Sequence, residues 1–400
     1  MGGAAGHLPH FYENPDITID EVKELLKNAS MGKIEKVTEK LDGKNIIFTW
    51  NKSINELRVA RNDGDLKSGG MGEEEVKEKF AGRNECLRES FTKGFEVLRD
   101  AVAALSDEEQ VEVFGESGNR WFSAEIFYSP SPNIVEYDTN FIAFHMTPVI
   151  EVEGGNINRM SLHPATEILA KNVQRMQKNV KLSDWEVHGP SFVKIKALTD
   201  GTVLNNSLGV INKEMARLGL PSSTTIGEVT RTSVRQQLEA MGLEGSALSD
   251  TLARVMKDPG APDLRALKKK YQFLGAKIEG AVRAEDRLKK EAVRFLDKAI
   301  GDFAMKFLET IETGYIRDNA AAVEEIRSLT RSAINKIRQK GDPGELAFLE
   351  AQLKRLGDEE EKSVKSAVEG IAFVYKGKVY KFTGAFAAAN QIIGKTRDWT

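Results

Sequence analysis

The chain has 400 residues, of which 40% are hydrophobic and 29% charged, and its formal net charge at pH 7 is −3. This composition is typical of a globular protein with two or more domains and excludes an intrinsically disordered chain. The net charge excludes a globally basic nucleic-acid binder, although it is compatible with a local basic surface. The single cysteine, Cys86, excludes an intrachain disulfide and a cysteine-rich metal site.

No run in the sequence approaches the roughly 18 apolar residues of a membrane-spanning helix. The first ten residues have neither a basic start nor an apolar core, so no signal peptide is predicted. We therefore expect a cytoplasmic protein that does not insert into a membrane.

The first third of the chain alternates between predicted helices and strands. Apolar residues at helical spacing predict helices over residues 21–29 and 73–105. Runs of β-branched and aromatic residues, in part alternating with polar ones, predict strands. The predicted strands cover residues 46–50, 56–60, 111–116, 121–128 and 141–146.

After Pro148 the pattern changes, and residues 150–366 are predicted to form a mainly helical region. Residues 162–180 predict a helix, residues 191–196 a short strand, and the apolar spacing over 293–307 a long helix packed against others. The lysines at 268–270 can face a phosphate backbone, but basic residues mixed with acids more often solvate a helix.

The segment Lys40-Leu41-Asp42-Gly43 precedes the strand predicted at 46–50 and is compatible with two interpretations. A lysine amine, whose usual pKa is about 10.4, becomes nucleophilic when burial or neighbouring cations lower that pKa. Gly43 permits a tight turn or a close approach to a ligand. The same residues are equally compatible with a charged turn that opens a hairpin.

Lys40-Leu41-Asp42-Gly43 resembles the Lys-x-Asp-Gly motif of the covalent nucleotidyltransferases, the superfamily of ATP-dependent DNA ligases, RNA ligases and mRNA capping enzymes. The resemblance implies that Lys40 attacks the α-phosphate of a nucleotide, with Glu39, Asp42 and Asn45 beside that nucleotide. The longer segment 39–45 is closer to RNA ligases, because DNA ligases usually carry arginine where this chain has Asn45.

Three further positions resemble the motifs that follow in this superfamily. Arg61, after the second strand, corresponds to a phosphate ligand, a role that suits the planar guanidinium. Glu125 corresponds to the strand acid that binds ribose or a metal. Phe144 corresponds to the ring that stacks on the base, although an aromatic residue at strand spacing is more often part of a core.

Residues 369–384 predict two strands joined by a Lys-Gly-Lys turn and resemble the last two motifs of the superfamily. Glu369 corresponds to the acid that positions a metal, and Lys381 to the lysine that holds the α-phosphate. The chain departs from these motifs at Val374, where lysine or arginine is common, and at Thr383, where a second lysine is common.

The resemblance implies an α+β fold with antiparallel sheets contributed by both ends of the chain. Residues 1–149 and 367–400 would form the nucleotidyltransferase (adenylation) domain, an ATP-grasp-like ligase fold, and residues 150–366 a helical insertion domain. Only sixteen residues follow Gly384 (400 − 384), too few for the oligonucleotide-binding barrel of DNA ligases and capping enzymes, which also favours RNA ligases.

The expected function is that of an ATP-dependent polynucleotide ligase with Mg²⁺, acting on nucleic acid with 5′-phosphate and 3′-hydroxyl ends, RNA rather than DNA. The helical insertion would bind this substrate or a protein. Two alternatives stay open: an adenylyltransferase acting on a protein or small molecule, and a non-catalytic nucleotide-binding scaffold. The sequence does not distinguish ATP from GTP.

Overall fold

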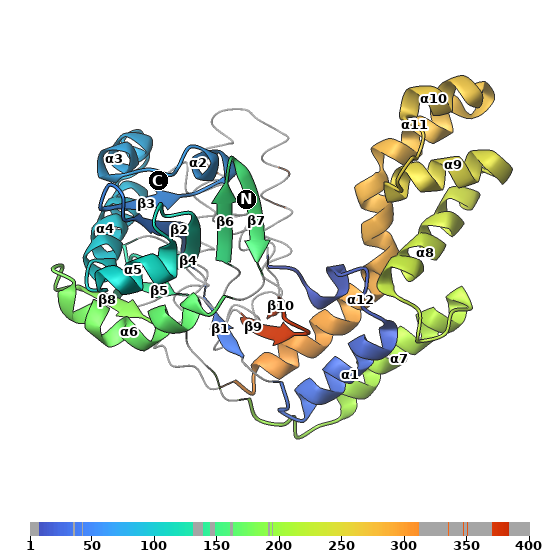
Figure 1. Ribbon diagram of the computed structural model, residues 1–400. Helices are drawn as coiled ribbons and strands as arrows, with labels where there is room; N and C mark the ends of the chain where they lie inside the picture. The colour runs from blue at the N-terminus through green and yellow to red at the C-terminus, as the bar shows by residue number, and fades with distance from the viewer. Residues whose placement is uncertain are drawn as a thin grey trace. The chain divides into compact units, whose positions relative to one another are not determined.

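The computed structural model describes residues 8–34, 37–41, 43–130, 139–144, 149–160, 163–190, 193, 195–311, 335, 347, 350 and 370–383. The fold is α+β with antiparallel sheets, as predicted. The chain divides into two compact units (Figure 1), a sheet unit of residues 1–8, 34–196 and 307–400 and a helical unit of residues 9–33 and 197–306.

The sheet unit contains a large sheet of seven strands, five of which lie in the order β3-β2-β4-β5-β8. All neighbours in this row pair antiparallel except β5 and β8, which are parallel. The hairpin of β6 and β7 joins the sheet through β4. The strands are β2 (Lys44–Asn51), β3 (Glu56–Ala60), β4 (Arg120–Phe127), β5 (Asn140–Phe144), β6 (Val149–Glu153), β7 (Asn156–Met160) and β8 (Trp185–His188).

One face of the large sheet forms the main hydrophobic core with helices of the same unit. The strand period of two sends Ile46 and Phe48 of β2 into this core, while Asn45 and Ile47 point to the opposite face. Phe48 is fully buried and tilts against Phe144 with ring centroids 5.4 Å apart. The helices of this unit are α2 (Asp63–Lys67), α3 (Glu73–Phe80), α4 (Glu85–Val102), α5 (Asp107–Phe114) and α6 (Ala165–Asn179).

A second, small sheet joins segments from near the two ends of the chain. Its strands are β1 (Thr38–Lys40), β9 (Gly370–Tyr375) and β10 (Lys378–Thr383), in the antiparallel order β1-β9-β10. One face is apolar: Phe373 and Phe382 are buried there, and Phe307 meets the Phe382 ring edge-on at 6.0 Å. This sheet confirms the prediction that both ends of the chain contribute to the antiparallel sheets.

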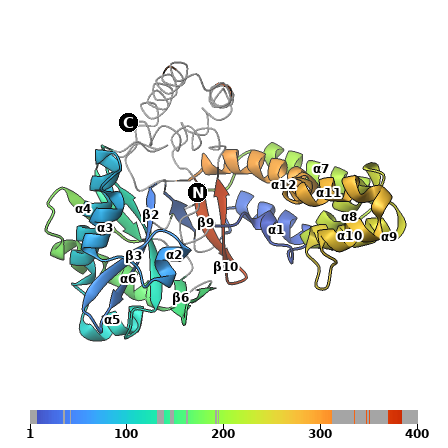
Figure 2. The same cartoon turned by 90° about the horizontal axis from the view of Figure 1, so that it is seen from above.

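The helical unit is built from helices (Figure 2) that bury apolar side chains in a shared core. Val234 and Leu238 of α8 pack with Leu252 of α9 and Ile278 of α11 in its core. The Tyr12 hydroxyl donates to Asp297 Oδ1 at 2.5 Å, which ties the start of the unit to α12. The helices are α1 (Ile19–Ser30), α7 (Thr202–Leu218), α8 (Ile226–Ala240), α9 (Gly245–Met256), α10 (Leu264–Lys270), α11 (Gly275–Arg283) and α12 (Glu285–Leu308), of which the last two residues, Phe307 and Leu308, belong to the sheet unit.

No helix among the described residues is both long and apolar enough to span a membrane. The two compact units and the predicted domains have different bounds, since residues 150–196 belong to the sheet unit and residues 9–33 to the helical unit.

Two secondary-structure predictions were wrong. Residues 111–116 were expected to form a strand, but residues up to Phe114 belong to α5, because Ser106 and Glu109 form a capping box that starts a helix. Residues 150–160 were expected within the mainly helical region, but with Val149 they form the β6–β7 hairpin. Of the strand expected at 191–196, the structure describes 193, 195 and 196, and Ile195 makes a single bridge to Ile311.

Replacement of Gly94 by alanine tests the packing of α4 on the large sheet. In a helix this change usually stabilises by about 1 kcal/mol, but a Cβ at Gly94 would lie 2.7 Å from Ile126 Cδ1. We expect a net loss of about 1–2 kcal/mol because the core has no room for the methyl group. The measurement is urea unfolding followed by circular dichroism.

The matched control is Gly280→Ala in α11, where the added Cβ meets no atom within 4 Å. This variant is expected to gain up to about 1 kcal/mol. A gain in Gly94→Ala of the same size would show that α4 is not packed on β4 as described.

Candidate active site

The small sheet places the two lysines of the predicted site on one face. Lys40 is the last residue of β1 and pairs with Gly370, whereas Lys381 of β10 pairs with Ala372, which itself pairs with Thr38 of β1. Direct partners across strands share a face, as do residues two apart along a strand. Lys40 and Lys381 therefore project from the same face, Lys40 half-buried and Lys381 only 6% exposed.

Glu39, which was predicted to lie beside the nucleotide, points to the other face of the small sheet. It pairs with Ile371 and is 2% exposed, on the apolar face that carries Phe373 and Phe382. The structure therefore does not bring the Glu39 side chain together with Lys40 and Lys381.

Gly43 connects the lysine strand to the large sheet at a point of close approach. A Cβ at this position would lie 2.6 Å from Phe127 Cζ and 2.9 Å from Glu125 Cβ, so only glycine fits against β4 here. Three residues of extended chain span at most about 11 Å. The Lys40 backbone is therefore held within about 11 Å of the Gly43 backbone, which rests on Glu125.

A polar cluster lies on the large sheet directly beyond Gly43. Asn45 of β2 and Glu125 of β4 are cross-strand partners, and the Asn45 amide donates to Ser123 Oγ at 2.7 Å and to Glu125 Oε1 at 3.4 Å. Ser123 is 4% exposed and Glu125 is half-buried. Two predicted site residues are thus in contact, and Ser123 is a further member that the sequence analysis missed, although it lies two residues before Glu125 on the same strand face.

Arg61 follows β3 and reaches the backbone of the same cluster. Its guanidinium donates to the Asn45 carbonyl and lies over the Phe91 ring, 4.6 Å from the ring centroid. Its own backbone N–H donates to Asp65 Oδ2 at 2.8 Å. The Arg61 side chain therefore sits at the rim of the core, with Asn45 in contact through its main chain.

Phe144 lies on the opposite face of the large sheet from Glu125. It pairs with Ala124, is 3% exposed and packs in the core on Phe48, so the structure does not bring it together with the polar cluster. The rings on the Glu125 face are those of Phe127 and Phe141, which stack with centroids 4.1 Å apart. Both are buried, and Gly43 rests against Phe127.

Asp42 and Glu369 lie outside the described residues. Within the part of the chain that the structure describes, no three histidine, cysteine or acidic side chains form a group that could hold a metal ion.

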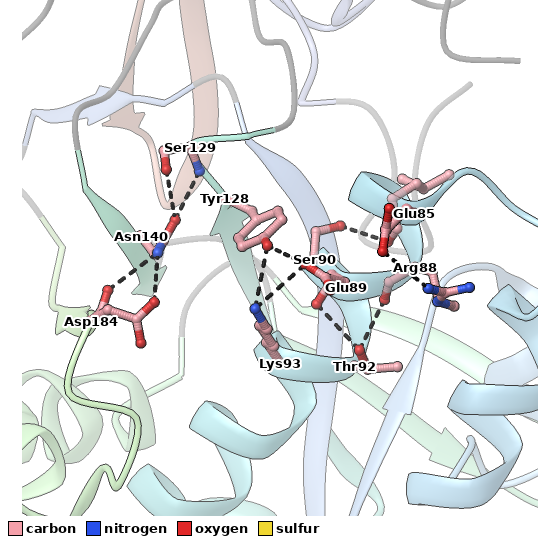
Figure 3. A network of polar contacts seen from close by, with 11 residues as sticks. Glu85, Arg88, Glu89, Ser90, Thr92, Lys93, Tyr128, Ser129, Asn140 and Asp184 are labelled. Atoms are coloured by element: carbon pink, nitrogen blue, oxygen red, sulfur yellow. Dashed lines mark hydrogen bonds and ion pairs between the residues drawn. The ribbon is translucent and has the colours of Figure 1, made fainter. Parts of the chain in front are cut away.

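A network of polar side chains anchors the end of β4, the strand that carries Ser123 and Glu125. Figure 3 shows Glu89 and Lys93 of α4 reaching the hydroxyl of Tyr128, which follows Phe127 directly. The Tyr128 hydroxyl donates to Glu89, Lys93 Nζ lies 3.3 Å from that hydroxyl, and the Tyr128 ring stacks on Trp185 at 5.9 Å. The bond to Tyr128 holds the pKa of Glu89 below its usual value of 4.5.

A second set of hydrogen bonds in Figure 3 links the ends of three strands, β4, β5 and β8. Asn140 Oδ1 accepts hydrogen bonds from the Ser129 N–H at 2.9 Å and the Ser129 hydroxyl at 3.1 Å. The Asn140 amide donates to Asp184 Oδ2 at 3.1 Å. These bonds fix β4, the strand that carries Ser123 and Glu125, against β5 and β8.

Comparison with known proteins adds no relative: no family model matches the chain, and neither the curated proteins nor the solved structures searched contain a significant match.

Replacement of Glu89 by glutamine tests the anchor of β4. The folded-state pKa of Glu89 lies below 4.5, so its carboxylate stabilises the fold above that pH and loses this contribution as the pH falls through the folded-state pKa. We expect Glu89→Gln to be less stable than the unaltered chain at pH 7 and the difference to shrink below about pH 4.5. Urea unfolding at a series of pH values measures it.

The control is Glu85→Gln in the same helix. It removes a carboxylate whose ion pair with Arg88 is long, at 3.8 Å between nitrogen and oxygen. It should change stability little at pH 7, because exposed ion pairs contribute at most about 1 kcal/mol. A stability difference between Glu89→Gln and the unaltered chain that stays constant from pH 7 to pH 3 would contradict the described network.

Proposed function

We propose that the protein is an ATP-dependent polynucleotide ligase that works through a covalent lysyl-AMP intermediate on Lys40. The observation that carries the proposal is the pairing of β1 with β9, which sets Lys40 and Lys381 on one face of a sheet made from distant parts of the chain. The fold expected for this activity, a nucleotidyltransferase core of two antiparallel sheets, is part of the proposal.

In the first step the neutral Lys40 amine attacks the α-phosphorus of ATP. A nitrogen–phosphorus bond forms, the bond between the α-phosphorus and the bridging oxygen breaks, pyrophosphate leaves, and the amine proton passes to solvent. The Lys381 ammonium, on the same sheet face, would stabilise the negative charge that builds on the α-phosphate oxygens.

In the later steps a 5′-phosphate oxygen attacks the same phosphorus and frees Lys40. A 3′-hydroxyl then attacks the 5′-phosphate, the new phosphodiester forms, and AMP leaves. We favour RNA as the polymer because of Asn45, which differs from the arginine usual in DNA ligases.

The polar cluster fits the sugar and the metal-bearing phosphates of the nucleotide. Asn45, Ser123 and Glu125 offer donors and acceptors for hydroxyl groups, and Arg61 lies against the same strand. Mg²⁺ is commonly bound by one or two carboxylates together with phosphates and water, so a cage of three protein ligands is not needed. Glu125 and Glu369 would hold the ion, which would neutralise phosphate charge.

The decisive test is incubation with α-labelled ATP or GTP and Mg²⁺. We expect acid-labile label on the chain from ATP, none on Lys40→Ala, and transfer of the label to 5′-phosphorylated RNA. Lys381→Gln should slow labelling by about 10²–10³-fold, the usual cost of losing one such charge-stabilising donor.

The matched control is Lys378→Gln on the same hairpin, because Lys378 is exposed whereas Lys381 is buried. It should label at the rate of the unaltered chain, and circular dichroism checks that both variants are folded. Label that moves to another protein instead of nucleic acid would indicate a protein adenylyltransferase. No label from either nucleotide would overturn the proposal.

A further inference from the structure

The helix α10, the turn after it and α11 lie at one end of the helical unit (Figures 1 and 2), and their sequence is rich in basic residues. Residues 264–284 contain six basic residues and one acid, a net charge of +5 (6 − 1), in a chain whose net charge is −3. All six basic side chains are exposed, and three of them form ion pairs, Lys268 and Arg283 with Glu279 and Lys270 with Asp250. They are Arg265, Lys268, Lys269, Lys270, Lys277 and Arg283.

The same end presents an aromatic ring to solvent. Phe273 lies in the 3₁₀ turn η2 (Gln272–Leu274) and is fully exposed, at 104% of the reference area. The other exposed large apolar side chains of the described residues, Met31 and Ile54, are only 47% and 58% exposed. Full exposure forgoes the gain from burying a ring, and here the exposed ring lies in the turn that directly follows the basic helix α10.

The turn that carries Phe273 is firmly held. The Leu274 N–H donates to the Tyr271 carbonyl at 2.9 Å, and the Tyr271 hydroxyl donates to Asp250 Oδ2 at 2.7 Å. Lys270 Nζ donates to the same carboxylate oxygen at 2.9 Å. The ring is therefore displayed from a fixed backbone, which lowers the entropy cost of binding through it.

Two cations on this surface increase the local repulsion. Arg265 and Lys269 are four residues apart on α10 and so lie on one helix face, and neither has an ion pair among the described residues. Like charges at this spacing destabilise a helix. A bound polyanion would relieve this repulsion.

We propose that the α10–α11 end binds single-stranded nucleic acid, with a base stacked on Phe273 and phosphates beside Arg265 and Lys269. Sequence-independent single-strand binding combines aromatic rings with positive side chains along the backbone. The bases of a duplex are already stacked and are not available to the ring. The inference deepens the proposed function, on which it rests for the view that the strand is the ligase substrate.

The test is fluorescence anisotropy of the full chain with labelled 20-nucleotide oligouridylate, oligothymidylate and a 20-base-pair duplex, without ATP. We expect single strands to bind, and Phe273→Ala to weaken their binding about tenfold while leaving the duplex unchanged. The oligouridylate and oligothymidylate arms decide whether RNA or DNA is preferred.

Two controls separate stacking from other uses of the ring. Phe273→Leu keeps an exposed apolar side chain without a ring and should lose as much affinity as Phe273→Ala. Ile54→Ala removes an exposed apolar side chain from the sheet unit and should bind normally. Full affinity in Phe273→Leu would replace stacking by apolar docking and overturn the proposal.

The charges are tested by salt dependence. The double variant Arg265→Gln, Lys269→Gln should reduce the slope of log affinity against log salt by about 1.4, at about 0.7 for each single-strand phosphate. The matched pair Lys178→Gln, Lys213→Gln removes two exposed lysines from other helices and should leave the slope unchanged.

The nucleotide-labelling assay on the same preparations keeps the two proposals apart. If the chain forms lysyl-AMP but does not bind single strands, the proposed binding surface alone is wrong, and Phe273 would then be expected to contact a protein partner. A chain that binds through Phe273 without forming lysyl-AMP would overturn the ligase alone.

Discussion

The pairing of β1 with β9 is the constraint on which the candidate site depends. Thr38 to Lys40 are only three residues, too few to be stable as an isolated strand, and they pair with β9, a strand from near the other end of the chain. Gly370, the residue opposite Lys40, also lets β9 lie close to β10, because a Cβ there would lie 2.4 Å from the Phe382 carbonyl oxygen of β10. Loss of this pairing would separate Lys40 from Lys381.

Gly43 couples that small sheet to the large one. Its lack of a side chain lets the backbone rest on Phe127 and Glu125, so the lysine strand and the Asn45–Ser123–Glu125 cluster lie within a short span of chain. The buried, stacked rings of Phe127 and Phe141 and the hydrogen bonds of the Tyr128 hydroxyl hold β4 in place. Reactive groups on supported strands are better positioned than groups on loops.

At the α10–α11 end of the helical unit, in contrast, the side chains proposed to bind a ligand are exposed to solvent. There the backbone is held by Asp250 and by buried Leu267 and Ile278, while the ring of Phe273 and six cations are left in solvent. Three of these cations form ion pairs, Lys268 and Arg283 with Glu279 and Lys270 with Asp250, whereas Arg265 and Lys269 have none among the described residues. A firm scaffold with an exposed ring and an excess of positive charge suits a flexible polyanion, since the partner then pays most of the ordering entropy.

The sequence by itself determined the elements whose local patterns are strong: α1, the long α12, β2, β4 and the β9–β10 hairpin agree with their predicted positions. It was wrong at α5, because an alternating Val-Glu-Val-Phe run fits a strand and only the capping box of Ser106 reveals a helix.

Only the tertiary structure decided which candidate side chains meet. The pairing partner of a strand depends on contacts distant in sequence, so the shared face of Lys40 and Lys381 and the inclusion of Ser123 were not visible in the sequence. The same applies to Glu39 and Phe144. A shift of one residue along a strand moves a side chain to the other face, and register alone put both of them on the faces opposite the site.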